Sequence, residues 1–242
     1  MPRPDRKAQA PVSARKKTAT KPARTTKGAG LSLTDRAYRD LEEMIVTLTL
    51  LPGSAVSETA LSQSLGIGRT PIREALQRLA RERLVTILPR RGIIVSEINI
   101  KSQLRLLEVR REVERLVARS AARRANAEER TRFLELAREF EKSAKTNDDV
   151  AFMRVDREFN EFSVKAARNE FAAGAMSLMH SLSRRFWYIH YKQAADLPLT
   201  AKLHADIARA IGAGDPAGAG KAMDKLIDTV AKFTRDTVMA DF

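Results

Sequence analysis

The chain has 242 residues, 43% of them hydrophobic and 5% aromatic, which is enough for two domains and favours helices over sheets. It contains no cysteine, which excludes disulfides, thiolate catalysis and cysteine-based zinc sites. The net charge of +14 favours a polyanionic partner. Because no apolar run approaches the ~20 residues that span a bilayer, and no hydrophobic signal core follows the N-terminus, we expect a cytoplasmic protein without membrane contact.

The first 30 residues carry nine lysines and arginines against one acid, which is more than half of the excess positive charge. They are rich in Pro, Ala, Thr and Gly and nearly lack large apolar side chains, so we predict a disordered basic tail over 1–30. Two interpretations of this tail stay open. It is either a salt-dependent clamp on DNA phosphates, or a solubilising extension or misassigned start.

The next segment has the pattern of a winged helix-turn-helix. Helical spacing of apolar residues predicts helices over about 34–48, 57–65 and 69–82, and Gly66 is placed to end the second one. Two β-branched runs around a Pro-Arg-Arg-Gly tip predict a hairpin over 84–98. Three short helices followed by a basic-tipped hairpin are typical of this DNA-binding fold.

The third helix begins with residues suited to DNA. Two of its arginines are four residues apart and share a polar face, where arginine can pair bidentately with guanine in the major groove. The helix N-terminus itself suits phosphate. A solvated surface charge is the commoner role of a single arginine, but the whole group favours operator binding. The residues that we predict to contact DNA are Arg69, Thr70, Arg73, Arg90, Arg91 and Gly92.

From Lys101 onward the pattern is helical throughout. We predict six antiparallel helices packed as a bundle that can enclose a ligand cavity, over 102–124, 127–145, 148–168, 170–192, 198–212 and 216–239. The fold class is therefore mainly α. We divide the chain into the tail, a winged helix-turn-helix domain over 31–97, and an all-helical ligand-binding and dimerisation domain over 98–242, with a hinge near 96–101.

Polar residues occur in this bundle where core packing alone would not put them. Arg110 and Glu114 share the apolar face of the first helix, either as an ordinary surface pair or as an arginine held by an acid and aimed into a cavity to bind a carboxylate. Asp156 lies in the buried arc of the third helix, with Asn160 at its edge. A buried carboxylate needs a partner, which His204 can supply, although a satisfied core histidine is the alternative.

One further segment, 183–191 (SRRFWYIHY), concentrates polar and aromatic groups. Some of these side chains could line the pocket. Ordinary core and surface packing is the interpretation that the pattern favours for Arg184, Arg185 and their neighbours.

The stretch LLPGSAVSETALSQSLGIGRTPIREALQRLARERLVTILPRRGIIV resembles the N-terminal domain of the GntR family of bacterial regulators. It has that family's Pro-Gly turn, the acid that opens the second helix, the Arg-Thr-Pro-x-Arg-Glu-Ala-Leu recognition helix and the Arg-Arg-Gly wing. It departs at Gly68, where the family usually has Ser or Thr. The resemblance implies operator contacts from the recognition helix and wing, and we expect Glu74 to be structural because an acid on that face would repel DNA.

Residues 100–230 resemble the FCD ligand-binding domain of the FadR-type subfamily, and the expected six helices are similar to its VanR-type branch. Many members hold a divalent metal with one Asp and three His and present it to an organic acid. This chain keeps Asp156 and His204 but has Asn160 and Leu226 at two of the histidine positions. An amide is a poor ligand and leucine is none. We therefore expect no metal, or a weakly held one.

The resemblance implies a small carboxylate effector, which we expect Arg110, Asp156, Asn160 and His204 to bind directly. The prediction is a non-enzymatic regulator, expected to be a repressor, that binds palindromic operator DNA as a homodimer. Two alternatives stay open. One is a constitutive DNA-binding protein with a degenerate effector pocket, and the other is a metal-dependent enzyme that uses Asp156 and His204 as base and acid.

Overall fold

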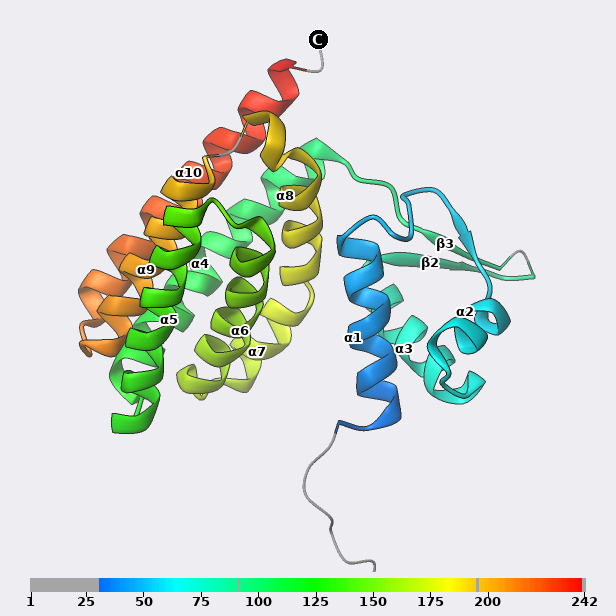
Figure 1. Cartoon of the computed structure of the whole chain (residues 1–242), viewed down its shortest axis with the longest axis horizontal. Coiled ribbons are helices and arrows are strands. Elements are labelled where there is room, and N and C mark those ends of the chain that lie inside the picture. The colour runs from blue at the N-terminus through cyan, green and yellow to red at the C-terminus, as the bar shows by residue number, and fades with distance from the viewer. Residues whose placement is uncertain (1–30, 91, 195, 241–242) are drawn as a thin grey trace, which may run out of the picture. The chain divides into compact units, whose positions relative to one another are not determined.

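The computed structural model describes residues 31–90, 92–194 and 196–240 (Figure 1). The predicted basic tail and Arg91 lie outside them. In chain order the elements are α1 (Leu33–Val46), β1 (Ala55–Val56), α2 (Glu58–Leu65), α3 (Arg69–Arg81), β2 (Val85–Leu88), β3 (Gly92–Val95), α4 (Ile100–Arg124), α5 (Ala127–Thr146), α6 (Asp149–Ala167), α7 (Glu170–Ser177), α8 (His180–Ala194), α9 (Leu197–Gly212) and α10 (Pro216–Ala240).

Local signals explain the N-terminal elements. Ser57 caps α2 through a hydrogen bond from the backbone N–H of Ala60, and Gly66 ends it in the left-handed conformation that glycine tolerates best, as predicted. The cap of α1 is Ser32, two residues before the predicted Thr34. The predicted hairpin is formed by β2 and β3, and β1 pairs with the free edge of β3. Two residues are too few to give β1 a periodic signature.

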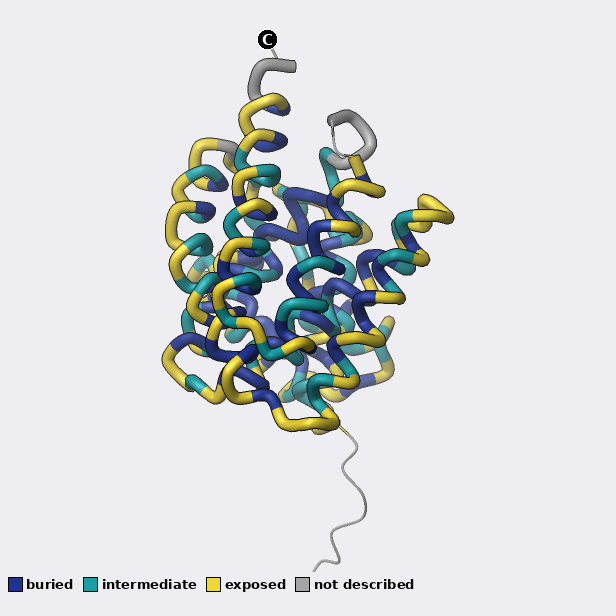
Figure 2. Tube along the Cα trace, turned by 90° about the vertical axis from the view of Figure 1, so that its left-hand side faces the viewer, coloured by how far each residue is buried: buried dark blue, intermediate teal, exposed yellow. Residues whose placement is uncertain are grey.

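The described residues from Ser32 onward form one compact unit with two hydrophobic cores. The smaller core joins α1, α2, α3 and the sheet through fully buried side chains such as Leu41, Ile72 and Leu79. In the larger core, α5 packs on α9 and α6, and α10 packs on α4 and α9. Figure 2 shows each helix turning its buried residues toward its neighbours. A mainly α chain with a winged helix-turn-helix and a helical bundle is confirmed.

One predicted helix, 170–192, is wrong, because the chain forms α7 and α8 there instead. The described C-terminal part thus has seven helices from α4 to α10 rather than six. Ser177 donates its hydroxyl to the Gly174 carbonyl at 2.8 Å, and Leu178 and Met179 bond three residues back instead of four. Gly174, which is a weak helix former, and the hydroxyl of Ser177, which competes for its carbonyl, thereby end α7 early.

The predicted hinge corresponds to a segment without regular structure between β3 and α4, from Ser96 to Asn99. Arg185 of α8 holds it by donating to the backbone carbonyls of Ser96 (2.8 Å) and Glu97 (3.3 Å). Burial lowers the pKa of Arg185 to about 10. Helix α8 also packs directly on α1, so it contacts both the larger core and the N-terminal elements. None of the described helices has a stretch both long and apolar enough to cross a bilayer.

Candidate functional site

The first turn of α3 exposes the three residues predicted to read DNA, namely Arg69, Thr70 and Arg73. The Arg73 guanidinium is held by Glu58, the residue that opens α2, with Nε 3.1 Å from Oε1 and Nη2 2.8 Å from Oε2. Arg69 Nη2 lies 3.9 Å from the same carboxylate. The hydrogen bond from Arg73 lowers the pKa of Glu58. Arg73 is therefore oriented before any ligand arrives, with 56% of its side chain exposed.

The acid next to Arg73 in sequence points elsewhere. Thr34 Oγ1 of α1 donates a hydrogen bond of 2.7 Å to Glu74 Oε2. This contact ties α3 to α1, so Glu74 has the structural role expected from the sequence.

The described residues at the tip of the β2–β3 hairpin have unusual backbone angles, and one of them is an exposed cation. Arg90 is exposed and has φ +62°, and Gly92 has φ +99°, a conformation that side chains other than glycine rarely adopt. A Cβ at Gly92 would meet no atom within 4 Å, so glycine is required there by the backbone rather than by crowding. The DNA contacts of these residues stay predictions.

The second candidate site is a buried cavity of about 50 Å³ inside the helical bundle. It is lined by side chains from α4, α6, α8, α9 and α10. All four predicted effector residues and the leucine at the missing histidine position line it: Arg110, Asp156, Asn160, His204 and Leu226. The sequence placed these residues on four separate helices, with Asp156 and Asn160 on the same one, and the fold brings them to one cavity.

The pair formed by Arg110 and Glu114 is buried. Arg110 Nε donates to Glu114 Oε1 at 2.6 Å, and the two side chains are only 11% and 6% exposed. The interpretation as an ordinary surface pair is therefore wrong. Glu114 holds the guanidinium of Arg110 at the edge of the cavity, where it can meet an anion.

Asp156 is the centre of the polar network. Its Oδ1 accepts from Asn160 Nδ2 at 3.0 Å and lies 3.2 Å from His204 Nε2. Burial alone would raise the pKa of Asp156, but the hydrogen bond and charge of His204, with the charge of Arg184, outweigh it and lower the pKa. His204 Nδ1 lies 2.8 Å from the Thr200 carbonyl. The His204 ring is thus held between the Asp156 carboxylate and the backbone carbonyl of Thr200.

The sequence did not single out His180, and for Arg184 it favoured ordinary packing over a place in the pocket. His180 begins α8 and lines the cavity, and Arg184, one turn later, places its Nε 3.7 Å from Asp156 Oδ2. The unbroken helix predicted over 170–192 concealed the significance of His180. The spacing of His180, Arg184 and Trp187 on one helix face is the signal that could have found the set, because all three line the cavity.

His180 is neutral at neutral pH. Burial lowers its pKa from the usual 6.5, and the nearby positive charges of Arg110 and Arg184 act in the same direction. The acids facing it, Glu114 and Asp156, raise the pKa but do not compensate.

We expect this histidine to make the fold acid-sensitive. Because the folded pKa lies below the unfolded value, the unfolded chain binds more protons between the two, and stability falls as pH drops below about 6.5. His180→Asn removes this titration and keeps a small polar side chain. Thermal melts at pH 7.5 and pH 5.5 should therefore show a smaller loss of melting temperature in the variant than in the wild type. Equal losses would contradict the assignment.

The donor set of the cavity does not fit a tightly held divalent ion. Asp156 and His204 lie together, but His180, which also lines the cavity, does not complete a three-ligand group with them; Asn160 donates its amide to the aspartate, and Leu226 offers no donor. Across the described chain, no group of three or more His, Cys, Asp or Glu side chains is arranged to hold a metal. The expectation that any ion here is weakly held stays a prediction.

A restoration experiment tests this expectation. Chelator is expected to leave the wild-type melting temperature unchanged to within ~1 °C, because a ligand that is not bound contributes no stability. The double variant Asn160→His/Leu226→His should instead gain about 5 °C or more with Zn²⁺ or Ni²⁺. This view of the cavity would be contradicted if chelator lowered the wild-type melting temperature, or if neither ion raised that of the double variant.

Comparison with known proteins places both parts of the chain in described families. Residues 33–95 match the family described as "Bacterial regulatory proteins, gntR family", and residues 105–229 match the FCD domain. The "HTH-type transcriptional repressor RspR" of Escherichia coli (strain K12) is 26% identical over 82% of this chain and 87% of its own length. An "Uncharacterized HTH-type transcriptional regulator in unstable DNA locus" of Streptomyces ambofaciens is 47% identical over 62 residues, 26% of each chain.

Some matches cover only part of the relatives. The "Uncharacterized HTH-type transcriptional regulator YdhC" of Bacillus subtilis (strain 168) is 29% identical over 54% of this chain and 59% of its own length. The solved structure titled "E. coli McbR/YncC" superposes with a TM-score of 0.74 at 18% identity, covering 86% of this chain and all of that one. At that identity the likeness is one of fold.

Proposed function

This chain belongs to the gntR family of bacterial regulatory proteins, with an FCD domain after its DNA-binding domain, and from that premise we propose that it is a transcriptional regulator whose operator binding responds to a small carboxylate. Two copies would place their α3 helices over the half-sites of a palindromic operator, since the two-fold symmetry of a dimer is mirrored in the DNA. The expected sign is repression.

On the DNA side, the observation that carries the proposal is the oriented guanidinium of Arg73. A bidentate hold by Glu58 fixes its plane while leaving half of the side chain in solvent. Such a preset fork loses little freedom when it meets guanine O6 and N7. Arg69 and Thr70 then contact neighbouring bases or phosphates, and the wing residues Arg90, Arg91 and Gly92 follow the adjacent minor groove.

On the effector side, the charges around the cavity support an anionic ligand. Arg110 and Arg184 face it, while the carboxylate of Asp156 is held by Asn160 and that of Glu114 lies behind Arg110. The cavity has a volume of only about 50 Å³. An effector of several carbon atoms therefore requires the surrounding helices to move apart, which would couple its binding to the rest of the fold.

Two alternatives were left open by the sequence. A degenerate pocket is less favoured, because random loss of function would not preserve buried charges that are each held by a partner. An enzyme is less favoured as well, since the chain's family is one of regulators, and Asp156 and His204 are engaged with each other.

The proposal is tested in two steps with the full chain. Genomic fragments retained by the protein are sequenced, and a specific site with two-fold symmetry is expected. Thermal-shift screening of metabolic carboxylates, with and without chelator, then looks for a compound that stabilises the protein and alters its hold on that site. Retention of fragments without any shared motif would refute the first half, and no stabilising carboxylate across a broad set would refute the second.

A further inference from the structure

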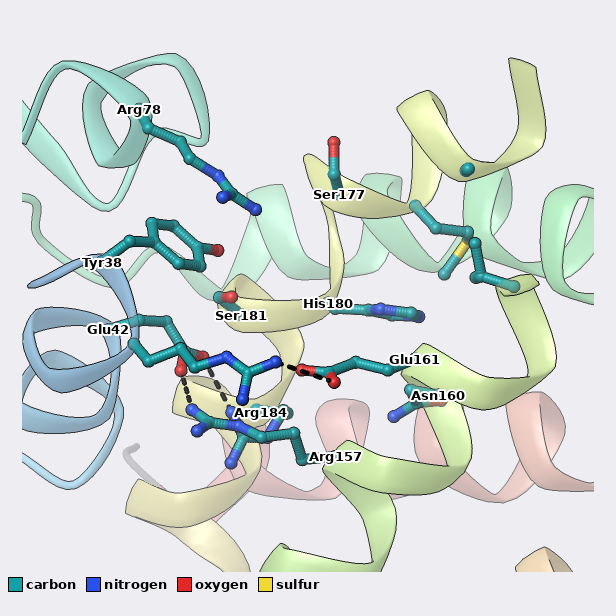
Figure 3. A pocket seen from close by; sticks show the side chains of 14 residues that line it. Tyr38, Glu42, Arg78, Arg157, Asn160, Glu161, Ser177, His180, Ser181 and Arg184 are labelled. Carbon is teal, nitrogen blue, oxygen red and sulfur yellow. Dashed lines mark hydrogen bonds and ion pairs between the residues drawn. The ribbon is translucent and has the colours of Figure 1, made fainter. Parts of the chain in front are cut away.

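An acid of the DNA-binding domain is buried against the helical bundle. Glu42 of α1 is 4% exposed, and both of its ion-pair partners belong to the bundle. Arg184 Nη1 of α8 donates to Glu42 Oε1 at 2.7 Å, and Arg157 Nη2 of α6 donates to Oε2 (Figure 3). A buried carboxylate with two arginine partners fixes how α1 lies on α6 and α8.

Arg184 faces acids on both sides, with Glu42 and the more distant Glu43 (Nη2 to Oε2, 3.7 Å) on α1 and Asp156 in the cavity. While Nη1 holds Glu42, its Nε lies 3.7 Å from Asp156 Oδ2 in the effector cavity. That Nε is buried and donates no hydrogen bond to any described residue. Arg184 also lines both the cavity and a groove of about 280 Å³ that reaches α1. Figure 3 shows Arg184 beside Glu42. Asn160 and His180, like Arg184, line both the groove and the cavity.

We propose that Arg184 is the residue through which the effector cavity controls the DNA-binding domain. A carboxylate entering the cavity accepts from the unused Nε–H and draws the guanidinium toward itself. Glu42 thereby loses its partner on α8, and the hold of the bundle on α1 weakens. The inference rests on the proposed function, because it takes the cavity as the effector site. It adds that Arg184 is the side chain through which binding in the cavity affects α1.

The charges that remain around Glu42 lower the free-energy cost of separating it from Arg184. Removing one partner from a buried ion pair is costly when the other stays buried. Here Glu42 keeps Arg157 of α6, and loosening of α1 from α8 lets water reach its free oxygen. Arg185 continues to hold the linker carbonyls of Ser96 and Glu97, so the DNA-binding domain loosens without losing its tether. Arg184 therefore has two arrangements in which its charge is paired, one with Glu42 and one with a carboxylate in the cavity. An allosteric response needs an element with two such states.

A tethered carboxylate replaces the unidentified effector in the test. Leu226→Glu puts a carboxylate into the cavity, and Leu226→Gln is the matched control of the same size without charge. Hydrogen exchange of the α1 amides is measured in the full chain, with α5 as the internal reference. We expect Leu226→Glu to speed α1 exchange at least about fivefold over Leu226→Gln, with α5 unchanged.

The same comparison is repeated with Arg184→Gln and with Arg157→Gln. The difference between the Glu and Gln variants should vanish without Arg184 and persist without Arg157, which holds Glu42 but does not line the cavity. Equal α1 exchange in the two Leu226 variants, or a difference that survives Arg184→Gln, would overturn the proposal. Neither DNA nor effector is used, so failure here is distinct from failure to bind an operator or a carboxylate.

If Leu226→Glu does not fold, a double-mutant cycle still tests whether Glu42 and Asp156 are coupled through Arg184. Glu42→Gln and Asp156→Asn are close in shape to the originals, and each leaves Arg184 the other acid. Together they leave the buried guanidinium with only Glu43, which lies 3.7 Å away and is 47% exposed, so the double variant should lose more unfolding free energy than the two singles combined. The excess should disappear in the Arg184→Gln background. Additive losses would show that the two acids do not share Arg184.

Discussion

Arg73→Ala is expected to abolish specific operator binding while the chain remains folded. Loss of a bidentate guanine contact costs about 1–3 kcal/mol per half-site, and a dimer loses two of them. The variant also frees the Glu58 carboxylate, which in the wild type is neutralised by Arg73 and in the variant would face the phosphates. Together these effects predict a fall in operator affinity of at least about a hundredfold. Arg69→Ala, whose contact with Glu58 is longer, should weaken binding by about 1–3 kcal/mol.

The measurement is a titration of the selected operator at fixed salt, since phosphate contacts make affinity strongly salt-dependent. Arg36→Ala is the matched control, because Arg36 is an exposed arginine of α1 that pairs with Asp40, and it should bind within about twofold of wild type. Adding Glu58→Gln to Arg73→Ala should recover part of the loss by removing the unmasked charge. Operator protection by Arg73→Ala at wild-type concentrations would refute the role assigned to α3.

Phe140→Ala is expected to destabilise the helical bundle more than any other substitution considered above. Phe140 is fully buried, and its ring centroid lies 5.8 Å from that of Phe152, 5.7 Å from Phe159 and 5.0 Å from the His204 ring. Removing a phenylalanine ring from such a core costs about 3–5 kcal/mol. For a chain of this length the melting temperature should fall by roughly 10 °C.

Phe171→Ala is the control for this substitution, because Phe171 on α7 is 82% exposed. Its free energy of unfolding should stay within about 0.5 kcal/mol of wild type. Chemical denaturation followed by circular dichroism measures both variants. A loss below ~1 kcal/mol in Phe140→Ala would mean that the bundle closes over the vacated space, and would remove Phe140 as the support beneath His204.

The sequence alone determined the elements whose signals are local. Ser57 and Gly66 bound α2 through a cap and a left-handed end, and the arginines of α3 lie on one face because four residues make about one turn. The polar residue in a buried arc of α6, Asp156, was visible for the same reason. Helical periodicity states which face is buried, and a charge on that face needs a partner.

Only the tertiary structure decided which partners meet. The break between α7 and α8 depends on a side-chain bond that competes with the helix, and β1 exists because β3 offers it a free edge. Arg184 and Glu42 are 142 residues apart in the chain, yet they share a 2.7 Å hydrogen bond. Periodicity carries no information about such a distance, because a contact between separate elements depends on how whole helices pack and not on the spacing within either one.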